Sequence, residues 1–476
     1  MKHRFTLARL LSRHAGALLV ASLALAGCMP AHRQAPVLAQ INVPDDWAAS
    51  RSVSGTRIDA RWWQSFGDES LDRYVEAARV RNTDLLAAGS RLDAARAQVQ
   101  LARSALGPTL RATTGVNVES APGAAGANSI SRAIQPGLQA SWELDLWGRL
   151  RAQARAAQLQ FLASAADRDA VALSISAGTV EAYIGLLALE SQLRQTQDTA
   201  KSRAEALRIA RDKASVGYTS QLQVTQAESE YQAVLQSLPQ LEASIARQYN
   251  ALRLLTGEVP GVRGSPSQAE RLARLRLPEV PVALPSELLR RRPDLAQAER
   301  LLAASDASLA ASRAAFLPQV SLSASLGSLF VNSLNYDPTR VWSIGGSVLA
   351  PLFDRGRLAA QYDTAAAQRD QAAFGYRGAV LKAFGDVENA LVGVDRLQQQ
   401  LDHAARRRVV LLRSVQYAKE RYESGYAPYL EQLDAQRNLY QTQIELINVR
   451  QAQLLNRLAL YKALGGGWRP EPASPS

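Results

Sequence analysis

The chain has 476 residues, a formal net charge of +12 at pH 7, and a single cysteine. One cysteine excludes an intramolecular disulfide framework. The sequence also contains no Lys/Arg run interleaved with aromatic residues, which argues against a nucleic-acid-binding surface. Ala, Leu, Gln, Arg and Glu dominate the middle of each half, a composition that favours long helices.

Residues 1–27 are arranged like a secretory signal peptide, with basic residues followed by an apolar run from Ala15 to Ala26. The run is about a dozen residues long, too short to span a bilayer. It ends in "LAGC", which resembles a bacterial lipobox. A thiol is the most nucleophilic side chain available to accept a diacylglyceryl group. We therefore expect Cys28 to carry a covalent lipid, diacylglycerol plus an N-acyl chain. The resemblance to lipoproteins implies, from Met29 at the second mature position, delivery to the outer membrane. The alternative is an incidental or buried cysteine.

The sequence then reads as two copies of one unit. Asn82 to Leu110 aligns with Arg292 to Val320, and the Gly-Tyr pair at Gly217 aligns with the pair at Gly425. Each copy has the order helix, strand, strand, long helix, turn, helix, which indicates an internal duplication. We expect a signal peptide at 1–27, a lipidated extended segment at 28–60, repeats at 61–256 and 286–464, a connector at 257–285 and a disordered tail at 465–476.

Four segments alternate between apolar and polar residues, at about 109–119, 136–146, 319–330 and 341–352. A period of two predicts strands with one apolar face. A soluble sheet is the commoner source of this pattern. However, about ten residues per strand suit a bilayer crossing, and four aromatic residues near the strand ends suggest an aromatic girdle. Four strands cannot close a barrel, so several chains would have to contribute. The four aromatic residues are Trp142, Trp147, Tyr336 and Trp342.

The long helices complete each repeat. We expect one helix from Leu71 to Ala105 and another from about Leu150 to Ser215, the latter about 100 Å long. The apolar positions of the latter follow a heptad, which favours helix-on-helix packing in a barrel or bundle over packing on a globular core. Gly217 can end that helix in the left-handed conformation, as Gly425 can in the second repeat. Ser220 and Gln223 form a capping-box pattern, and Pro428 suits the first turn of the last helix.

Several motifs together resemble the TolC-like outer-membrane efflux channels, in the lipoprotein branch that serves resistance-nodulation-division pumps. They include "WELDLWGR" at Trp142, "LLRRRPDLAQAE" at Leu288 and "RYESGYAPYLEQLDAQRNLY" at Arg421. The resemblance implies an α+β membrane protein that forms a homotrimer. Twelve strands would make a transmembrane barrel, continued by a periplasmic α-helical barrel. It also implies a passive exit duct in contact with outer-membrane lipids, a periplasmic membrane-fusion adaptor and an inner-membrane transporter.

The resemblance also assigns roles to residues at the two turns. It places a periplasmic aperture at Gln223, Tyr422, Glu431 and Asp434, where three copies of the two carboxylates would favour cations. The family more often has an acidic residue where Gln223 stands, and sometimes a basic one where Ala427 stands. The alternative for Glu431 and Asp434 is a solvated helix face. The expected adaptor-contact tips are Gly217, Tyr218, Gly425 and Tyr426.

Two other classes of protein fit less well. An enzyme is disfavoured because the sequence shows no phosphate-binding loop and no metal-ligand spacing. A periplasmic coiled-coil adaptor lipoprotein should carry one helical hairpin between β modules, whereas this chain has two. Within the same architecture, an exit channel for type I protein secretion remains the nearer alternative.

Overall fold

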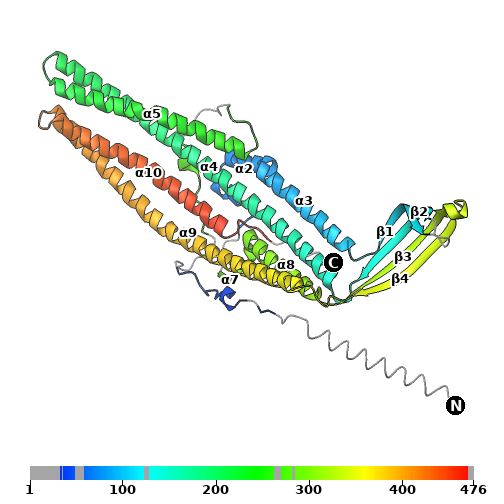
Figure 1. Ribbon diagram of the computed structural model, residues 1–476. Coiled ribbons are helices and arrows are strands. Elements are labelled where there is room, and N and C mark those ends of the chain that lie inside the picture. Colours follow the sequence, from blue (N-terminus) through cyan, green and yellow to red (C-terminus); the bar gives the residue numbers. More distant parts are fainter. Residues whose placement is uncertain are drawn as a thin grey trace. The chain divides into compact units, whose positions relative to one another are not determined.

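A computed structural model describes residues 33–34, 36–48, 58–122, 128–261, 270–280 and 285–469. The expected signal peptide and Cys28 lie outside the described residues. Contacts divide the chain into two units, each of which combines segments from both halves of the sequence (Figure 1). The strand unit comprises Met1–Ile41, Arg91–Ala165 and Gln297–Arg377, and the hairpin unit comprises Asn42–Ser90, Ala166–Ala296 and Gly378–Ser476.

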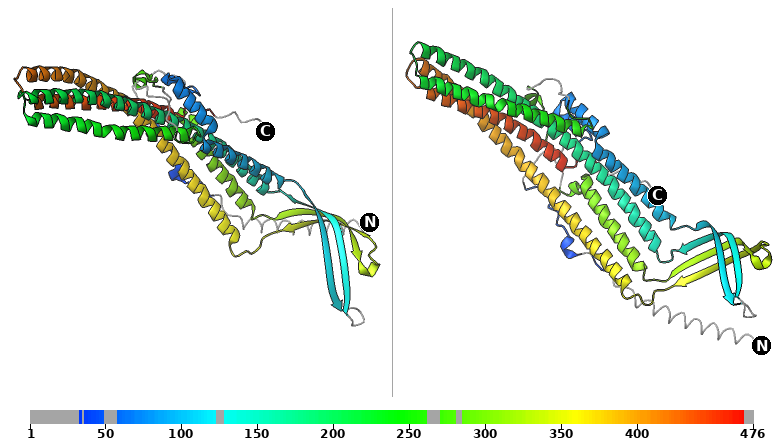
Figure 2. Two further views of the ribbon diagram at one scale, coloured as in Figure 1. Left: turned by 90° about the horizontal axis from the view of Figure 1, so that it is seen from above. Right: turned by 45° about the horizontal axis from the view of Figure 1, so that its top comes forward.

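The strand unit contains one antiparallel sheet in the order β1-β2-β3-β4 (Figure 2). Its strands are β1 (Thr109–Pro122), β2 (Asn128–Leu144), β3 (Gln319–Val331) and β4 (Thr339–Leu349). β2 begins earlier than the expected 136, because the tip of β1 continues to pair with it as far as Pro122 opposite Asn128. Among the described residues, the outer edges of β1 and β4 pair with no further strand. Two long edges are therefore available for pairing.

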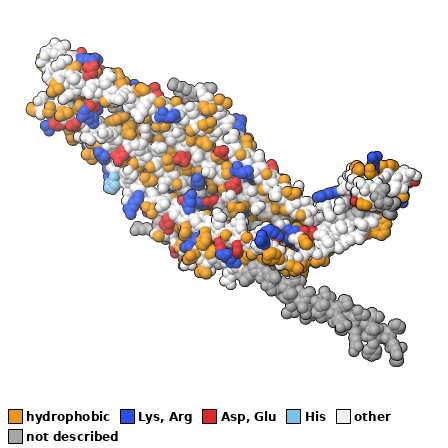
Figure 3. Space-filling model, viewed as in Figure 1, with side chains coloured by type: hydrophobic (Ala, Val, Ile, Leu, Met, Phe, Trp, Pro, Cys, Tyr) orange, Lys and Arg blue, Asp and Glu red, His pale blue; other side chains and the backbone are white. Residues whose placement is uncertain are grey.

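The strand register gathers the apolar side chains on one face of the sheet. Leu138 pairs with Leu326, which pairs in turn with Trp342. None of the residues in the four strands is buried. Trp342 is 72% exposed and Ile344 is 81% exposed, and hydrophobic side chains lie on the surface in this region (Figure 3). In the part of the chain that the structure describes, the apolar face of the sheet is therefore uncovered.

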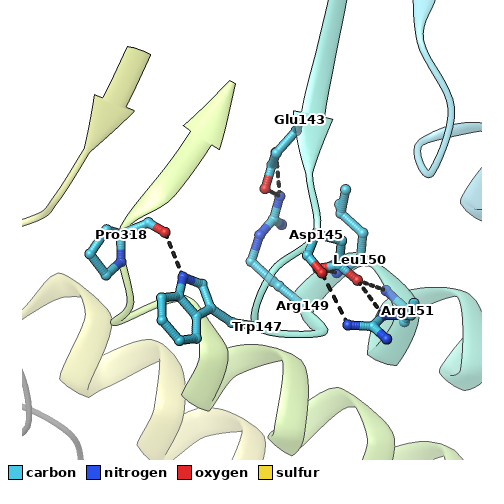
Figure 4. A network of polar contacts seen from close by, with 7 residues as sticks. All are labelled: Glu143, Asp145, Trp147, Arg149, Leu150, Arg151 and Pro318. Carbon is cyan, nitrogen blue, oxygen red and sulfur yellow. Dashed lines mark hydrogen bonds and ion pairs between the residues drawn. The ribbon is translucent and has the colours of Figure 1, made fainter. Parts of the chain in front are cut away.

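The motif "WELDLWGR" forms the junction between β2 and the following helix, α4 (Arg149–Ser215) (Figure 4). Asp145 accepts hydrogen bonds from the amides of Leu150 and Arg151, at 3.0 and 2.9 Å, and so caps the start of α4. Arg149 donates to both oxygens of Glu143 at 2.8 Å. The two bonds accepted by Asp145 satisfy backbone donors that a helix start leaves open.

Two tryptophans fasten the same junction to the segments that enter β1 and β3. The indole N–H of Trp142 donates to the carbonyl of Leu106 at 2.9 Å, and that of Trp147 donates to the carbonyl of Pro318 at 2.7 Å (Figure 4). Two of the four aromatic residues expected at a girdle therefore also hold the strand unit together.

Corresponding helices of the two sequence halves have equal lengths. α3 (Thr83–Ser104) and α8 (Pro293–Ala314) have 22 residues each, α4 and α9 (Arg357–Glu423) have 67, and α5 (Gln221–Leu255) and α10 (Tyr429–Ala463) have 35. Three shorter helices are α2 (Glu69–Arg81), α6 (Arg271–Arg274) and α7 (Pro285–Arg291). One 18-residue window of α4 is apolar enough for a membrane span by composition, yet half of it is buried. This fits a helix whose apolar seam packs on other helices.

The single helix expected from Leu71 to Ala105 is interrupted at Asn82. The Asn82 side chain accepts hydrogen bonds from the amides of Asp84 and Leu85, at 3.0 and 3.2 Å, and so caps α3. Its amide nitrogen donates to the carbonyl of Leu255, at the end of α5. The break thus joins three helices of the hairpin unit.

The expectation of a disordered tail from 465 is wrong for residues 465–469. The indole N–H of Trp468 donates to Asp169 at 2.8 Å. Gly467 has a φ of 73°, and a Cβ there would lie 2.3 Å from the carbonyl oxygen of Asp59. This close backbone approach, together with the positive φ, requires glycine. The end of the described chain is therefore packed into the hairpin unit.

Candidate functional site: the two helical turns

The α4–α5 and α9–α10 turns have the same backbone geometry. Gly217 and Gly425 adopt left-handed φ angles of 78° and 77°. The amide of Tyr218 donates to the carbonyl of Lys213, and the amide of Tyr426 to that of Arg421, both at 2.9 Å. This six-to-one bond defines a Schellman helix end, which a glycine in the left-handed conformation permits.

The tyrosines that follow the two glycines project into solvent. Tyr218 is 85% exposed and Tyr426 is 80% exposed, although both are large and partly apolar. Two exposed tyrosines at matched turns are available to a partner, because an aromatic ring with a hydroxyl suits a partly wet interface.

The helix starts after the turns differ from the expected caps. Ser220 lies at the N-cap of α5, but its side chain makes no capping hydrogen bond, so the expected capping box is not formed. Instead the side-chain oxygen of Gln223 accepts from the hydroxyl of Thr219. Pro428 lies at the N-cap of α10 with extended geometry, one residue before the first turn in which we expected it.

The α4–α5 helices form a first hairpin and the α9–α10 helices form a second. The two hairpins pack against each other through an apolar cluster directly below the turns. Around the cluster lie Ala214, Tyr231 and Tyr422, and the rings of Tyr422 and Tyr429 are 5.5 Å apart. Burying these side chains holds the hairpins together without a polar bond. The cluster consists of Leu207 and Ala210 of α4, Val224 and Ala227 of α5, and Tyr429 and Leu433 of α10.

Gln223 and Tyr422 meet at the edge of this cluster. The hydroxyl of Tyr422 donates to the side-chain oxygen of Gln223 at 3.3 Å, which links the second hairpin to the first. The ammonium of Lys213 lies 5.0 Å from the centre of the Tyr422 ring, within cation–π range. Two of the four residues expected at the aperture are therefore in direct contact.

Glu431 and Asp434 lie exposed on α10, and each has an arginine partner. Arg421 Nε is 3.4 Å from Glu431, and Arg437 is 3.3 Å from Asp434. Arg437 also bonds Glu230 of α5 and so links the hairpins a second time. These arginines are not among the residues predicted at the aperture. The Asp434–Arg437 spacing of three along a helix could have indicated one pair, whereas the Arg421–Glu431 contact depends on the turn.

Deeper in the bundle, Arg203 of α4 is 4% exposed and donates to the side-chain oxygen of Gln436 on α10. Burial lowers the pKa of the Arg203 guanidinium, while the negative charge of Glu230 partly opposes this shift. A buried guanidinium needs such partners, because an uncompensated charge in the interior is costly. Together these contacts join the two hairpins through a polar layer below the apolar cluster.

Comparison with known proteins agrees with this geometry. The outer membrane efflux protein family matches residues 74–258 and 284–466. The chain belongs to this family. It is 34% identical over 454 residues to the pyoverdine export outer membrane protein OpmQ of Pseudomonas aeruginosa, covering 92% of this chain and 94% of the relative. It is 30% identical over 458 residues to the cation efflux system protein CusC of Escherichia coli, covering 94% and 97%.

Solved structures of outer-membrane channels have the same fold. The channel OprN superposes with a TM-score of 0.83 at 29% identity, covering 93% of this chain and 99% of that one. The open state of the MtrE channel of Neisseria gonorrhoeae gives a TM-score of 0.80 at 29% identity, with 92% and 98% covered. The chain is thus an outer membrane efflux protein by sequence and by fold.

Family membership confirms some of the expectations from the sequence and leaves others as predictions. The resemblance to the efflux channels and the outer-membrane location are confirmed. The relatives include the probable outer membrane lipoprotein SilC of Salmonella typhimurium, 29% identical over 456 residues and covering 93% of this chain and 96% of that one. The roles assigned to Cys28, to the aperture residues and to the turn tyrosines stay predictions.

Proposed function

We propose that this outer membrane efflux protein is the exit duct of a tripartite pump of the resistance-nodulation-division class. It would passively conduct small molecules across the periplasm and the outer membrane. The observation that carries the proposal is the four-stranded sheet, whose two edges and apolar face are not covered by any described residue. In lipid an open edge leaves backbone groups unpaired, so the sheet needs further copies to close it.

Three copies would give a twelve-stranded barrel. The equal lengths of α4 and α9, and of α5 and α10, support a helical barrel in which six similar hairpins alternate around the axis. The lipid on Cys28 would add a second attachment to the outer membrane, since one inserted chain contributes hydrophobic free energy of its own. In this assembly Gln223, Tyr422, Glu431 and Asp434 would surround the periplasmic opening.

Tyr218 and Tyr426 would contact the periplasmic adaptor, which in turn would bring the inner-membrane transporter into the assembly. The support for this role is that the two turns share one geometry and one exposed residue type. A partner that repeats around an axis could use both turns in a similar way.

The test combines two measurements on the purified protein. Gel filtration with light scattering should give a trimer, and the trimer should form stable pores in planar lipid bilayers. A monomer without pore activity would overturn the proposal. A cysteine at Tyr218 or Tyr426 should cross-link to the cognate adaptor, whereas a cysteine at Val80, 70% exposed on α2, should not. Equal cross-linking at all three positions would reject the assignment of the tips.

A further inference from the structure

The segment that follows the expected lipid site is bound along helix α9. The described residues Arg33, Gln34 and Pro36 to Gln40 form this N-terminal segment, with a short 3-10 helix at Val37–Ala39. The amide of Arg33 donates to the hydroxyl of Tyr362 at 3.4 Å, and the Arg33 guanidinium lies 3.6 Å from Asp370. All these residues belong to the strand unit.

Arg369 is the centre of this contact. It is 4% exposed, and one of its terminal nitrogens donates to the carbonyls of Arg33 and Gln34, at 3.1 and 2.9 Å. Its Nε donates to Asp370 at 2.9 Å, and its other terminal nitrogen lies 3.9 Å from Asp306 of α8. The carboxylates offset the cost of burying the guanidinium, which leaves two donors directed at the segment.

The segment is held by its backbone rather than by its apolar side chains. Val37 and Leu38 are 75% and 72% exposed, whereas the carbonyl of Leu38 accepts a hydrogen bond from Arg377. Arg369 and Arg377 lie eight positions apart on α9, about 12 Å along the helix, so they hold the segment at two separated points. Apart from the ion pair of Arg33 with Asp370, these contacts are made to the main chain of the segment and do not depend on its side chains.

The position of the site limits where a lipid on Cys28 can go. Arg33 is the fifth residue after Cys28, and a chain of five residues spans at most about 18 Å. Tyr362, which binds the amide of Arg33, lies five positions after the start of α9, about 8 Å along the helix. The anchor can therefore reach the junction of sheet and helices and pass it by no more than about 10 Å.

We propose that Tyr362, Arg369 and Arg377 form a docking site for the backbone of the N-terminal segment, which holds the lipid anchor beside the base of the barrel. Arg369 is the principal positioning residue. The inference uses the lipid on Cys28 from the proposed function, but the docking itself does not require the lipid. The two parts can therefore be tested separately.

Limited trypsin digestion of the folded assembly tests the docking. The bond after Arg33 should resist cleavage, because its carbonyl is bound by Arg369 and a protease needs a locally released chain. In Arg369→Ala and Arg369→Lys, cleavage after Arg33 should accelerate about tenfold or more, since hydrogen bonds from a charged donor are lost. Lysine keeps a positive charge beside Asp306 and Asp370 but cannot reproduce the planar guanidinium fork.

Two controls make this digestion specific. Val37→Ser with Leu38→Ser should leave cleavage after Arg33 unchanged, and Arg396→Ala, on the same helix, should do so as well. If Arg369→Ala exposes many trypsin cleavage sites at once, the result with Arg369→Lys decides whether the docking exists. Rapid cleavage after Arg33 in the wild type, or wild-type protection in Arg369→Lys, would overturn the docking.

A double-variant comparison tests the anchor. One form carries the native signal, and the other carries a signal for unlipidated secretion that leaves no Cys28. Mass spectrometry of the released N-terminal peptide reports the lipid. Arg369→Lys should lower the heat-dissociation midpoint of the trimer in lipid vesicles only in the lipidated form. An equal loss in both forms would overturn the anchoring role, and a peptide without lipid would refute the lipidation while leaving the docking intact.

Discussion

Tyr422 makes three interactions, and those with Gln223 and Lys213 of the first hairpin oppose separation of the two hairpins. Its ring packs against Tyr429, its hydroxyl bonds Gln223, and the ammonium of Lys213 lies over its face. The family often has an acidic residue where Gln223 stands, and a carboxylate would accept a stronger, charge-assisted bond. With an amide acceptor, a closed state of the proposed aperture would rely more on packing and less on this bond.

Replacing Tyr422 with phenylalanine separates the two contributions, because it removes the hydroxyl and keeps the ring. A neutral hydrogen bond contributes about 0.5–1.5 kcal/mol, so each bond lost from the proposed trimer should raise the ratio of open to closed channels about two- to tenfold. Tyr417→Phe, at an exposed tyrosine of the same helix, is the matched control. Single-channel recordings in planar bilayers measure the ratio, and equal open probabilities in the two variants would contradict the expected effect.

The ion pair between Arg421 and Glu431 determines what effect we expect from removing the Glu431 carboxylate. In Glu431→Ala/Asp434→Ala, Arg421 loses its carboxylate partner at the turn, while Arg437 keeps Glu230. The double substitution should therefore not only weaken the cation selectivity of the opening but also make the opening prefer anions. Reversal potentials in a salt gradient measure this shift, and Glu420→Ala/Glu423→Ala on α9 removes the same charge elsewhere. Identical selectivity in both double variants would mean that Glu431 and Asp434 do not line the pore.

At the scale of elements, β2 and β3 form the pairing that joins the two sequence halves within the sheet. Gly327 pairs with Gly137 of β2, and a Cβ at Gly327 would be 2.6 Å from the carbonyl oxygen of Pro136. Gly327→Ala should separate the strands at this point and destabilise the sheet by about 1–3 kcal/mol. Gly345→Ala should be tolerated, because the nearest atom to its Cβ would be 3.7 Å away. Gly327→Ala and Gly345→Ala can be compared by the yield of heat-resistant trimer that each gives in the outer membrane.

The motif "RRPDL" joins three helices of the second repeat. Arg292 is 7% exposed and bonds Asp294, Asp386 and the carbonyl of Ala463. Burial would raise the pKa of the Asp294 carboxyl, but the hydrogen bond and positive charge of Arg292 outweigh it and lower the pKa below its usual value. The pair therefore contributes stability above about pH 4, which is lost as the pH falls through the lowered pKa.

Asp294→Asn should lower the unfolding midpoint at neutral pH by about 2–4 °C. The difference from the wild type should shrink as the pH falls below 4, because protonation removes the same charge from the wild-type residue. Asp84→Asn is the matched control. Asp84 of the first repeat aligns with Asp294, but Asn82 stands where the second repeat has Arg292. Midpoints from pH 3 to pH 7 test this, and a difference that does not change with pH would exclude the ion pair as its cause.

Local patterns predicted some of these elements and not others. The strand alternation, the long helix after Leu150 and the glycines of the turns follow from spacing and residue type, which act within a few residues. The break at Asn82, the docking of Arg33 on Arg369 and the pairing of Arg421 with Glu431 depend on contacts across the fold. Periodicity carries no information about such contacts. Asn82 and Arg292 occupy aligned positions of the two repeats and both join helices, although their side chains differ.

At the scale of the whole molecule, the edges of β1 and β4, unpaired among the described residues, would determine how copies meet in the proposed trimer. The strands alternate in direction, so β1 of one copy and β4 of the next would pair antiparallel and close the sheet. Leu110 shares a face with Ile344 through the register of Ala140 and Ala324, and Val348, four residues further along β4, lies on that face too. Leu110 and Val348 both lie near the helical ends of their strands.

Cysteines at Leu110 and Val348 in one chain should therefore form disulfides between neighbouring copies. Mild oxidation in membranes should convert Leu110→Cys/Val348→Cys into covalent dimers and trimers on a non-reducing gel. Arg111→Cys/Val348→Cys should remain monomeric, because Arg111 points to the opposite face and its cysteine could not reach the required geometry. Trimers without larger species would establish a closed ring of three. An open series of higher oligomers would refute closure, and equal cross-linking of both pairs would refute the pairing of these edges.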